Sequence, residues 1–243
     1  MAKKKEETKD KTERCATGIQ GFDVLCEGGL IADSANLVVG NAGAGKTTFL
    51  LQFLHNGAVK YNEKGLYVSF EPEVAELYKA GRKQGMDFEK LEEEGKCFFL
   101  KLADRMNLGE IEKTLTNFVV KNDIKRICFD PINVFAIRLK KDYGIRVQIY
   151  NLISLLKKLA VCVVIAGEAE EEKATGEAEL EEDVIFTKYL VDGVIELFSS
   201  GLGGEGDRAV RISKMRMTNH VRGPVGMKID NSGIKVLGKA KFL

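Results

Sequence analysis

The sequence predicts one α/β domain, in which a mostly parallel, twisted sheet carries helices on both faces and an antiparallel extension at its C-terminal end. Short apolar runs of the kind found in buried strands alternate with stretches whose apolar residues recur at helical spacing. This alternation indicates right-handed strand–helix–strand crossovers and therefore parallel strands. Past residue 192 the helical spacing ends and one strand pattern follows another, which indicates antiparallel strands.

The elements are expected in the following order. Residues 1–14 are almost wholly charged or polar, which predicts a disordered tail followed by a single domain over residues 15–243. Strands are expected over residues 36–40, 65–71, 97–103, 126–130, 161–167, 193–199, 209–217 and 226–237. Two helices are expected because their apolar residues fall on one helix face; these residues are Ile111, Leu115, Phe118 and Val119 in the first helix, and Ile145, Ile149, Leu152, Ile153 and Leu156 in the second.

The composition narrows the class of protein. A chain of 243 residues with 44% hydrophobic and 30% charged residues is typical of one globular domain. No apolar run reaches the roughly 20 residues that span a bilayer. The charged start also lacks the apolar core of a signal peptide, so we expect a cytoplasmic protein without a membrane partner. The five cysteines form no CxxC pair, which argues against a zinc site or a disulfide framework.

The most specific motif follows the apolar run 36–39. Residues 40–47 match the pattern G-x-x-x-x-G-K-[ST] of a P-loop, and a helical stretch over residues 48–60 follows. Glycines let the backbone N–H groups of such a loop surround phosphate oxygens, and the helix N-terminus adds its positive dipole end. Lys46 is expected to reach the β- and γ-phosphates, and the Thr47 hydroxyl to bind Mg²⁺. The expected nucleotide-binding residues are Gly40, Asn41, Ala42, Gly43, Ala44, Gly45, Lys46, Thr47 and Thr48.

Two further strand patterns end in a carboxylate. Asp130 ends the run 126–130, where it could hold a magnesium-bound water beside Thr47. Glu71 ends the run that follows the P-loop helix and is the candidate base for an attacking water. The alternative for Glu71 is a helix N-cap, with Pro72 at the first helical position. Both assignments are compatible with the local sequence.

Two cations mark the C-terminal extension. Lys214 and Arg216 are two residues apart in a strand pattern, so their side chains point to the same face of the sheet. Such a pair could clamp a phosphate in the manner of an arginine finger. The alternative is a solvated basic edge strand.

Taken together, these residues resemble the KaiC-like branch of the RecA superfamily. The resemblance rests on residues 17–30, 67–71, 130–168 and 214–220, and extends over residues 15–237. It implies a RecA-like ATPase that binds ATP and Mg²⁺, assembles as a homo-oligomeric, hexameric ring and holds nucleotide between subunits. It also implies that Glu71 activates water and that Lys214 and Arg216 reach the γ-phosphate of a neighbour. RecA-type proteins often carry a cis peptide after the magnesium-site aspartate, so Asp130–Pro131 is expected to be cis.

Three functions are compatible with this reading. The first is a regulatory ATPase whose nucleotide state sets ring shape and the binding of a protein partner. The second is a recombinase-like or recombinase-mediator ATPase that binds single-stranded DNA. A basic loop (Arg138, Lys140, Lys141, Arg146) favours DNA, but the acidic segment 168–183, with nine acidic residues against one lysine, would repel phosphate. The third is a switch that binds ATP with little turnover. We favour the first.

Overall fold

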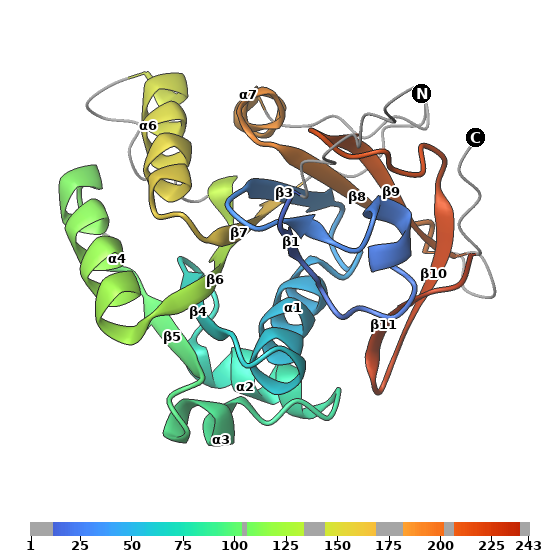
Figure 1. Ribbon diagram of the computed structural model, residues 1–243, viewed down its shortest axis with the longest axis horizontal. Helices are drawn as coiled ribbons and strands as arrows, with labels where there is room; N and C mark the ends of the chain where they lie inside the picture. Colours follow the sequence, from blue (N-terminus) through green and yellow to red (C-terminus); the bar gives the residue numbers. More distant parts are fainter. Residues whose placement is uncertain (1–11, 104–105, 134–143, 169–181, 202–206, 239–243) are drawn as a thin grey trace, which may run out of the picture.

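The computed structural model describes residues 12–103, 106–133, 144–168, 182–201 and 207–238. A nine-stranded sheet runs through the molecule in the order β11-β10-β9-β8-β3-β7-β6-β4-β5 (Figure 1). Its six parallel strands are β8 (Gly193–Ser199), β3 (Ala35–Gly40), β7 (Cys162–Glu168), β6 (Ile124–Asp130), β4 (Lys64–Ser69) and β5 (Cys97–Lys101). The remaining three strands are antiparallel, which confirms the predicted fold class.

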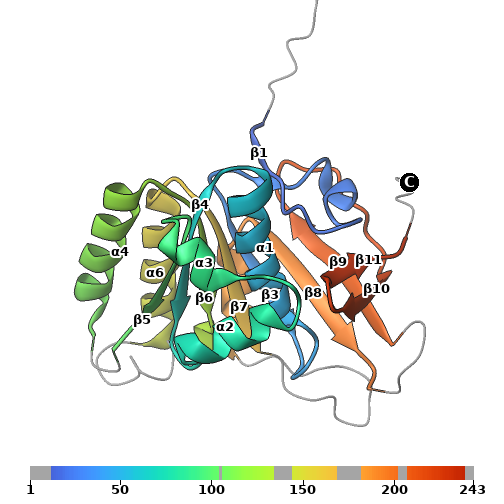
Figure 2. The same ribbon diagram turned by 90° about the horizontal axis from the view of Figure 1, so that it is seen from below.

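Helices cover both faces of the sheet, as Figure 2 shows. On one face lie α1 (Lys46–Lys60), α2 (Val74–Arg82) and α3 (Phe88–Glu93), whose apolar side chains join one core cluster. On the other face lie α4 (Leu108–Asn122), α6 (Ile145–Lys158) and α7 (Glu182–Leu190), which form a second cluster. The two helices expected from apolar spacing are α4 and α6. Their predicted apolar residues pack in or against this second cluster, except for Ile145, whose side chain lies outside the described part of the chain. None of the described helices is both long and apolar enough to cross a membrane.

The C-terminal extension consists of β9 (Arg208–Met215), β10 (Val225–Asp230) and β11 (Gly233–Val236). The expectation of a single strand over residues 226–237 is wrong, because β10 and β11 form a hairpin. The Asp230 carboxylate accepts hydrogen bonds from the backbone N–H (2.9 Å) and hydroxyl (2.6 Å) of Ser232. Gly233 follows with φ 92°, a conformation that favours glycine. These two features make the turn that the apolar pattern concealed.

The N-terminal segment packs beside the main sheet. Arg14 was expected in the tail, but it lies in the short strand β1 (Arg14–Cys15), which pairs with β2 (Leu30–Ile31). Its guanidinium donates to Glu27 and to the Thr218 hydroxyl, which joins the start of the described chain to the segment after β9. Residues 1–11 of the expected tail lie outside the described residues.

The parallel order decides where polar residues gather. Strands β3, β7, β6 and β4 are neighbours, and all four point their carboxyl ends to the same edge. In open α/β sheets ligands bind at this edge. The P-loop, Glu168, Asp130 and Glu71 all stand at or directly after these strand ends.

Candidate functional site

The P-loop joins the end of β3 to the start of α1. Gly43 (φ 74°) and Gly45 (φ 105°) take left-handed conformations that side chains rarely adopt, so glycine is needed at both positions. A Cβ atom on Gly40 would lie 2.5 Å from the carbonyl oxygen of Leu197 on the neighbouring strand. A left-handed backbone thus explains two glycines of the motif, and a close approach of two strands explains the third. Helix α1 begins at Lys46, with its N-terminus in the loop.

The Lys46 side chain is folded back onto this loop. Its Nζ donates to the carbonyl oxygens of Gly40 (2.9 Å) and Asn41 (3.1 Å), and lies 4.0 Å from the Glu168 carboxylate. Burial lowers the pKa of Lys46, while the carboxylates of Glu168 and Asp130 oppose that shift. The ammonium group thus sits at the mouth of the loop, held by weakly competing acceptors that a phosphate could replace.

Asp130 lies beside the first turn of α1, as predicted. Its Oδ2 accepts hydrogen bonds from the hydroxyls of Thr47 (3.4 Å) and Tyr67 (2.5 Å). Burial raises the pKa of Asp130, and the hydrogen bond from Tyr67 and the charge of Lys46 act in the opposite direction. The Asp130–Pro131 peptide bond is cis, which confirms that expectation.

The donor set fits a magnesium ion. Magnesium prefers oxygen ligands and keeps several waters, so a hydroxyl and a carboxylate beside a phosphate-binding loop are sufficient protein groups. Thr47 and Asp130 supply these two oxygens, and they would hold the ion. A magnesium ion held there would neutralise charge on the oxygens of a phosphate bound to the loop.

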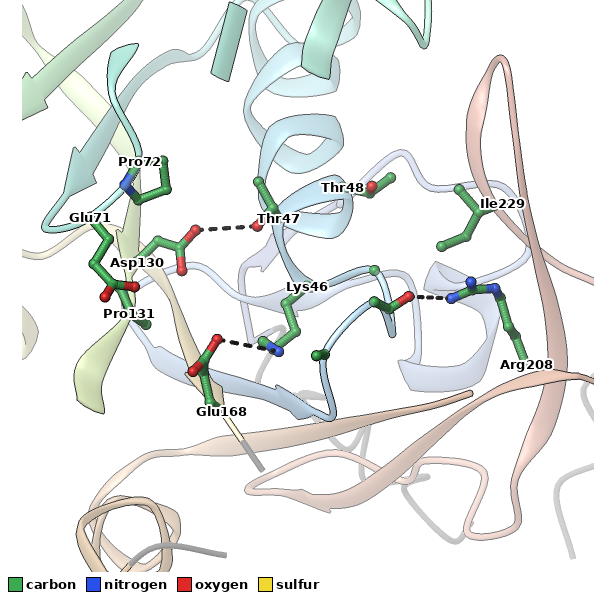
Figure 3. A pocket seen from close by; sticks show the side chains of 13 residues that line it. Lys46, Thr47, Thr48, Glu71, Pro72, Asp130, Pro131, Glu168, Arg208 and Ile229 are labelled. Carbon is green, nitrogen blue, oxygen red and sulfur yellow. Dashed lines mark hydrogen bonds and ion pairs between the residues drawn. The ribbon is translucent and has the colours of Figure 1, made fainter. Parts of the chain in front are cut away.

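Glu71 follows β4 and lies on the wall of the same cavity, with Pro72 beside it (Figure 3). Its side chain is exposed. The N-cap of α2 is Glu73, whose backbone N–H donates to the Glu76 carboxylate at 3.3 Å. Glu71 is therefore not the cap of this helix, and the alternative assignment with Pro72 at the first helical position is wrong. An exposed carboxylate beside the P-loop is what a water-activating role requires, and that role stays a prediction.

Two residues of the site were not assigned to it from the sequence. Glu168 ends β7, where its backbone N–H donates to Asn133 Oδ1 at 2.8 Å and its carboxylate faces Lys46. Arg208 opens β9, opposite Ser199 at the end of β8, and donates to the Gly43 carbonyl at 2.5 Å. The sequence feature that could have indicated Arg208 is the predicted antiparallel pairing of β9 with β8, which brings the first residue of β9 to the end of the sheet where the P-loop lies.

These side chains surround one cavity of about 590 Å³, within the range of small-molecule sites. Figure 3 shows Glu71, Asp130 and Glu168 on one side of Lys46, and Arg208 on the other side of the loop. The cavity thus combines two cations next to the P-loop with a row of carboxylates from three strand ends. An anionic ligand with a bound cation suits this separation of charge better than a bare anion.

Lys214 and Arg216 lie at the other end of the strands, away from the P-loop. Lys214 pairs with Val194 near the start of β8, and its Nζ donates to carbonyl oxygens of Lys188, Tyr189 and Val191. Arg216 donates to the Asp192 carboxylate at 3.1 Å. Asp192 precedes Leu197, the partner of Gly40, by five residues, or roughly 16 Å of strand.

Neither cation therefore contacts its own P-loop, and the action of the pair on a neighbouring subunit stays a prediction. The basic loop residues Arg138, Lys140 and Lys141 lie outside the described part of the chain, as do residues 169–181 of the acidic segment. Arg146, the fourth basic residue, lies on α6 over the ring of Phe186 at 5.8 Å.

Comparisons with known proteins agree with the fold. The family model described as "ATPase: KaiC" matches residues 15–241. Among solved structures, a KaiC-like protein from the hyperthermophilic archaeon Pyrococcus horikoshii OT3 is 30% identical, with a TM-score of 0.81 over 93% of this chain and 100% of that one.

Two curated relatives are circadian clock proteins. The circadian clock oscillator protein KaiC of Prochlorococcus marinus is 29% identical over 94% of this chain and 46% of its own length. The circadian clock protein KaiC2 of Synechocystis is 32% identical over 92% of this chain and 40% of its own length. This chain thus spans about half the length of the curated relatives it matches. The match over residues 15–241 shows that the chain belongs to the KaiC family of ATPases.

Proposed function

We propose that this protein binds ATP with Mg²⁺ and hydrolyses it, as a subunit of a ring-forming regulatory ATPase. The observation that carries the proposal is the meeting of three groups at one cavity: the Lys46 ammonium in the P-loop, and the Thr47 hydroxyl 3.4 Å from the Asp130 carboxylate. The first supplies charge to phosphate, and the other two supply oxygen ligands to magnesium.

The binding step begins with an exchange of acceptors. Lys46 leaves the carbonyls of Gly40 and Asn41 and donates to phosphate oxygens, which are stronger acceptors because they are charged. The backbone N–H groups of residues 42–48 and the N-terminus of α1 bind the remaining oxygens. Arg208, already on the Gly43 carbonyl, adds a second positive charge from the other side of the loop.

The hydrolytic step needs a base and charge stabilisation. Glu71 is exposed at the cavity wall, where it would accept a proton from the attacking water. A γ-phosphate bound to an isolated subunit would face solvent on one side, where developing charge is stabilised only weakly. Lys214 and Arg216 of an adjacent subunit would complete that side, which links turnover to assembly.

The test separates binding from turnover. Lys46→Ala should abolish ATP binding, measured by calorimetry, whereas Glu71→Gln should keep binding and lose most of the steady-state hydrolysis. Glu73→Gln is the matched control for Glu71, since it removes a neighbouring exposed carboxylate from the helix cap. Wild-type ATP affinity in Lys46→Ala would refute the site. ATPase assays with and without single-stranded DNA test the alternative of a recombinase-like, DNA-binding ATPase. Mass measurements with and without nucleotide test whether the protein assembles into a ring.

A further inference from the structure

Tyr67 has a contact that packing alone does not explain. It lies on β4 beside Cys128 of β6, fully buried, with its ring stacked on Phe99 at 5.7 Å. Its hydroxyl donates to Oδ2 of Asp130. A phenylalanine would fill the same space without a hydroxyl to desolvate, and burying a hydroxyl costs free energy unless it finds a partner. The partner here is the carboxylate that we assign to the magnesium site.

This contact fixes a group that is otherwise free to turn. The terminal torsion of an aspartate is soft and roughly two-fold, so its carboxylate needs partners to hold one orientation. Oδ2 of Asp130 accepts from Thr47 on α1 and from Tyr67 on β4, so two different elements hold it. Oδ1 accepts no hydrogen bond from the described residues. The two hydroxyls thus occupy one oxygen and leave the other available.

Of the two hydroxyls, only that of Thr47 would bind a metal ion directly. Thr47 is itself a proposed ligand, so its oxygen would turn to the ion. Tyr67 stands behind Asp130 in the core and is absent from the cavity wall. Its hydrogen bond can therefore persist while the site is loaded, as outer-shell partners of metal ligands do.

We propose that Tyr67 is a positioning residue of the magnesium site: its hydroxyl holds the Asp130 carboxylate in the orientation that binds the metal ion. Tyr67 touches neither nucleotide nor metal and acts through Asp130. The inference rests on the proposed function, because it needs a magnesium-dependent nucleotide site. It predicts that removal of one oxygen atom from the core weakens metal binding and leaves the P-loop intact.

The full chain offers a matched pair of variants. Tyr67→Phe removes the hydroxyl on Asp130. Tyr78→Phe removes a second phenol that also donates to a carboxylate, that of Glu92, and that packs on the same Phe99 ring at 5.0 Å, away from the cavity. Binding of a fluorescent ATP analogue is followed by polarisation, first in EDTA and then across a magnesium titration. Electron paramagnetic resonance of Mn²⁺ gives a second measure of metal affinity.

In EDTA, both variants should bind the analogue as the wild type does. The magnesium concentration at half-saturation should rise on the order of tenfold in Tyr67→Phe, the lower end of the range for loss of an outer-shell partner, and stay unchanged in Tyr78→Phe. An equal magnesium requirement in Tyr67→Phe and the wild type would overturn the inference. Loss of metal-free binding in Tyr67→Phe would overturn it too, since the hydroxyl would then support the fold. If the wild type itself binds no nucleotide, the proposed function fails and the inference falls with it.

Discussion

Arg126 gives a sharp test of how the sheet holds the P-loop helix. This residue of β6 is fully buried; its Nε donates to Glu63 at 2.6 Å and its Nη1 donates to the Phe53 carbonyl of α1 at 3.0 Å. The guanidinium also lies 4.6 Å from the centre of the Phe53 ring. Its Nη2 is buried and has no hydrogen-bond partner among the described residues. We compare Glu63→Gln, which leaves the cation buried, with Arg126→Met, which removes it.

We expect Glu63→Gln, the smaller change, to destabilise the protein more than Arg126→Met. Removing one partner of a buried ion pair costs about 3–5 kcal/mol. Glu63 keeps 34% of its side chain exposed, and an amide still accepts from Nε, so we expect about 2 kcal/mol for Glu63→Gln. Arg126→Met loses the bond to Phe53 but also removes the unpartnered Nη2, and Glu63 can turn to solvent. Methionine adapts to irregular space, so this variant should lie within about 1 kcal/mol of the wild type.

The assay is urea unfolding at 25 °C followed by far-UV circular dichroism. With equal m-values, the shift in midpoint gives the change in the free energy of unfolding. Both variants are read against Glu112→Gln, which changes an exposed glutamate on α4. A larger loss of unfolding free energy in Arg126→Met than in Glu63→Gln would refute the reasoning. It would mean that the contacts of the Arg126 guanidinium stabilise the fold by more than its burial costs.

Three further outcomes are expected. Gly57→Ala should lower the free energy of unfolding by about 1–3 kcal/mol despite the better helix propensity of alanine, because the new Cβ would lie 2.5 Å from the Arg126 side chain. Gly109→Ala on α4, where a Cβ has room, should not lower it. Burial raises the pKa of Glu196, but hydrogen bonds from Lys188 and Arg211 outweigh it and lower that pKa. The contribution of Glu196 to stability should therefore be complete above its unfolded-state pKa of about 4.3 and be lost as pH falls through its lowered folded-state pKa. Glu196→Gln should reduce the loss of stability at acidic pH. Arg216→Ala should lower ATP turnover by orders of magnitude, and mixing it with excess Lys46→Ala subunits should restore part of that turnover. An absence of rescue would contradict a role of Arg216 in the site of a neighbouring subunit.

The sequence alone established the parts whose signal is contiguous. The P-loop needs three glycines and a Lys-Thr pair at fixed spacing, and it was found with its flanking strand and helix in place. The order of the six parallel strands and of helices α1, α4 and α6 followed from hydrophobic period, because a buried strand and a half-buried helix distribute apolar residues differently. Asp130 was found because a parallel strand delivers its last residue to the edge where the P-loop lies.

Other features depended on pairs of residues far apart in the chain. Arg208 reaches Gly43 across 165 residues, and Tyr67 reaches Asp130 across 63, through strand pairings that no local pattern specifies. The helix cap at Glu73 and the turn before Gly233 depended on local hydrogen bonds that compete with the strand and helix patterns.

The catalytic roles of Glu71, Lys214 and Arg216 remain predictions, and the structure contributes their placement: Glu71 at the cavity, the two cations at the far edge of the sheet. The physical reason for the division is that backbone periodicity and phosphate-binding loops are encoded within a few consecutive residues. The side chains that hold the ligand-binding residues in place are set instead by strand register and packing, which bring together distant parts of the chain only after folding.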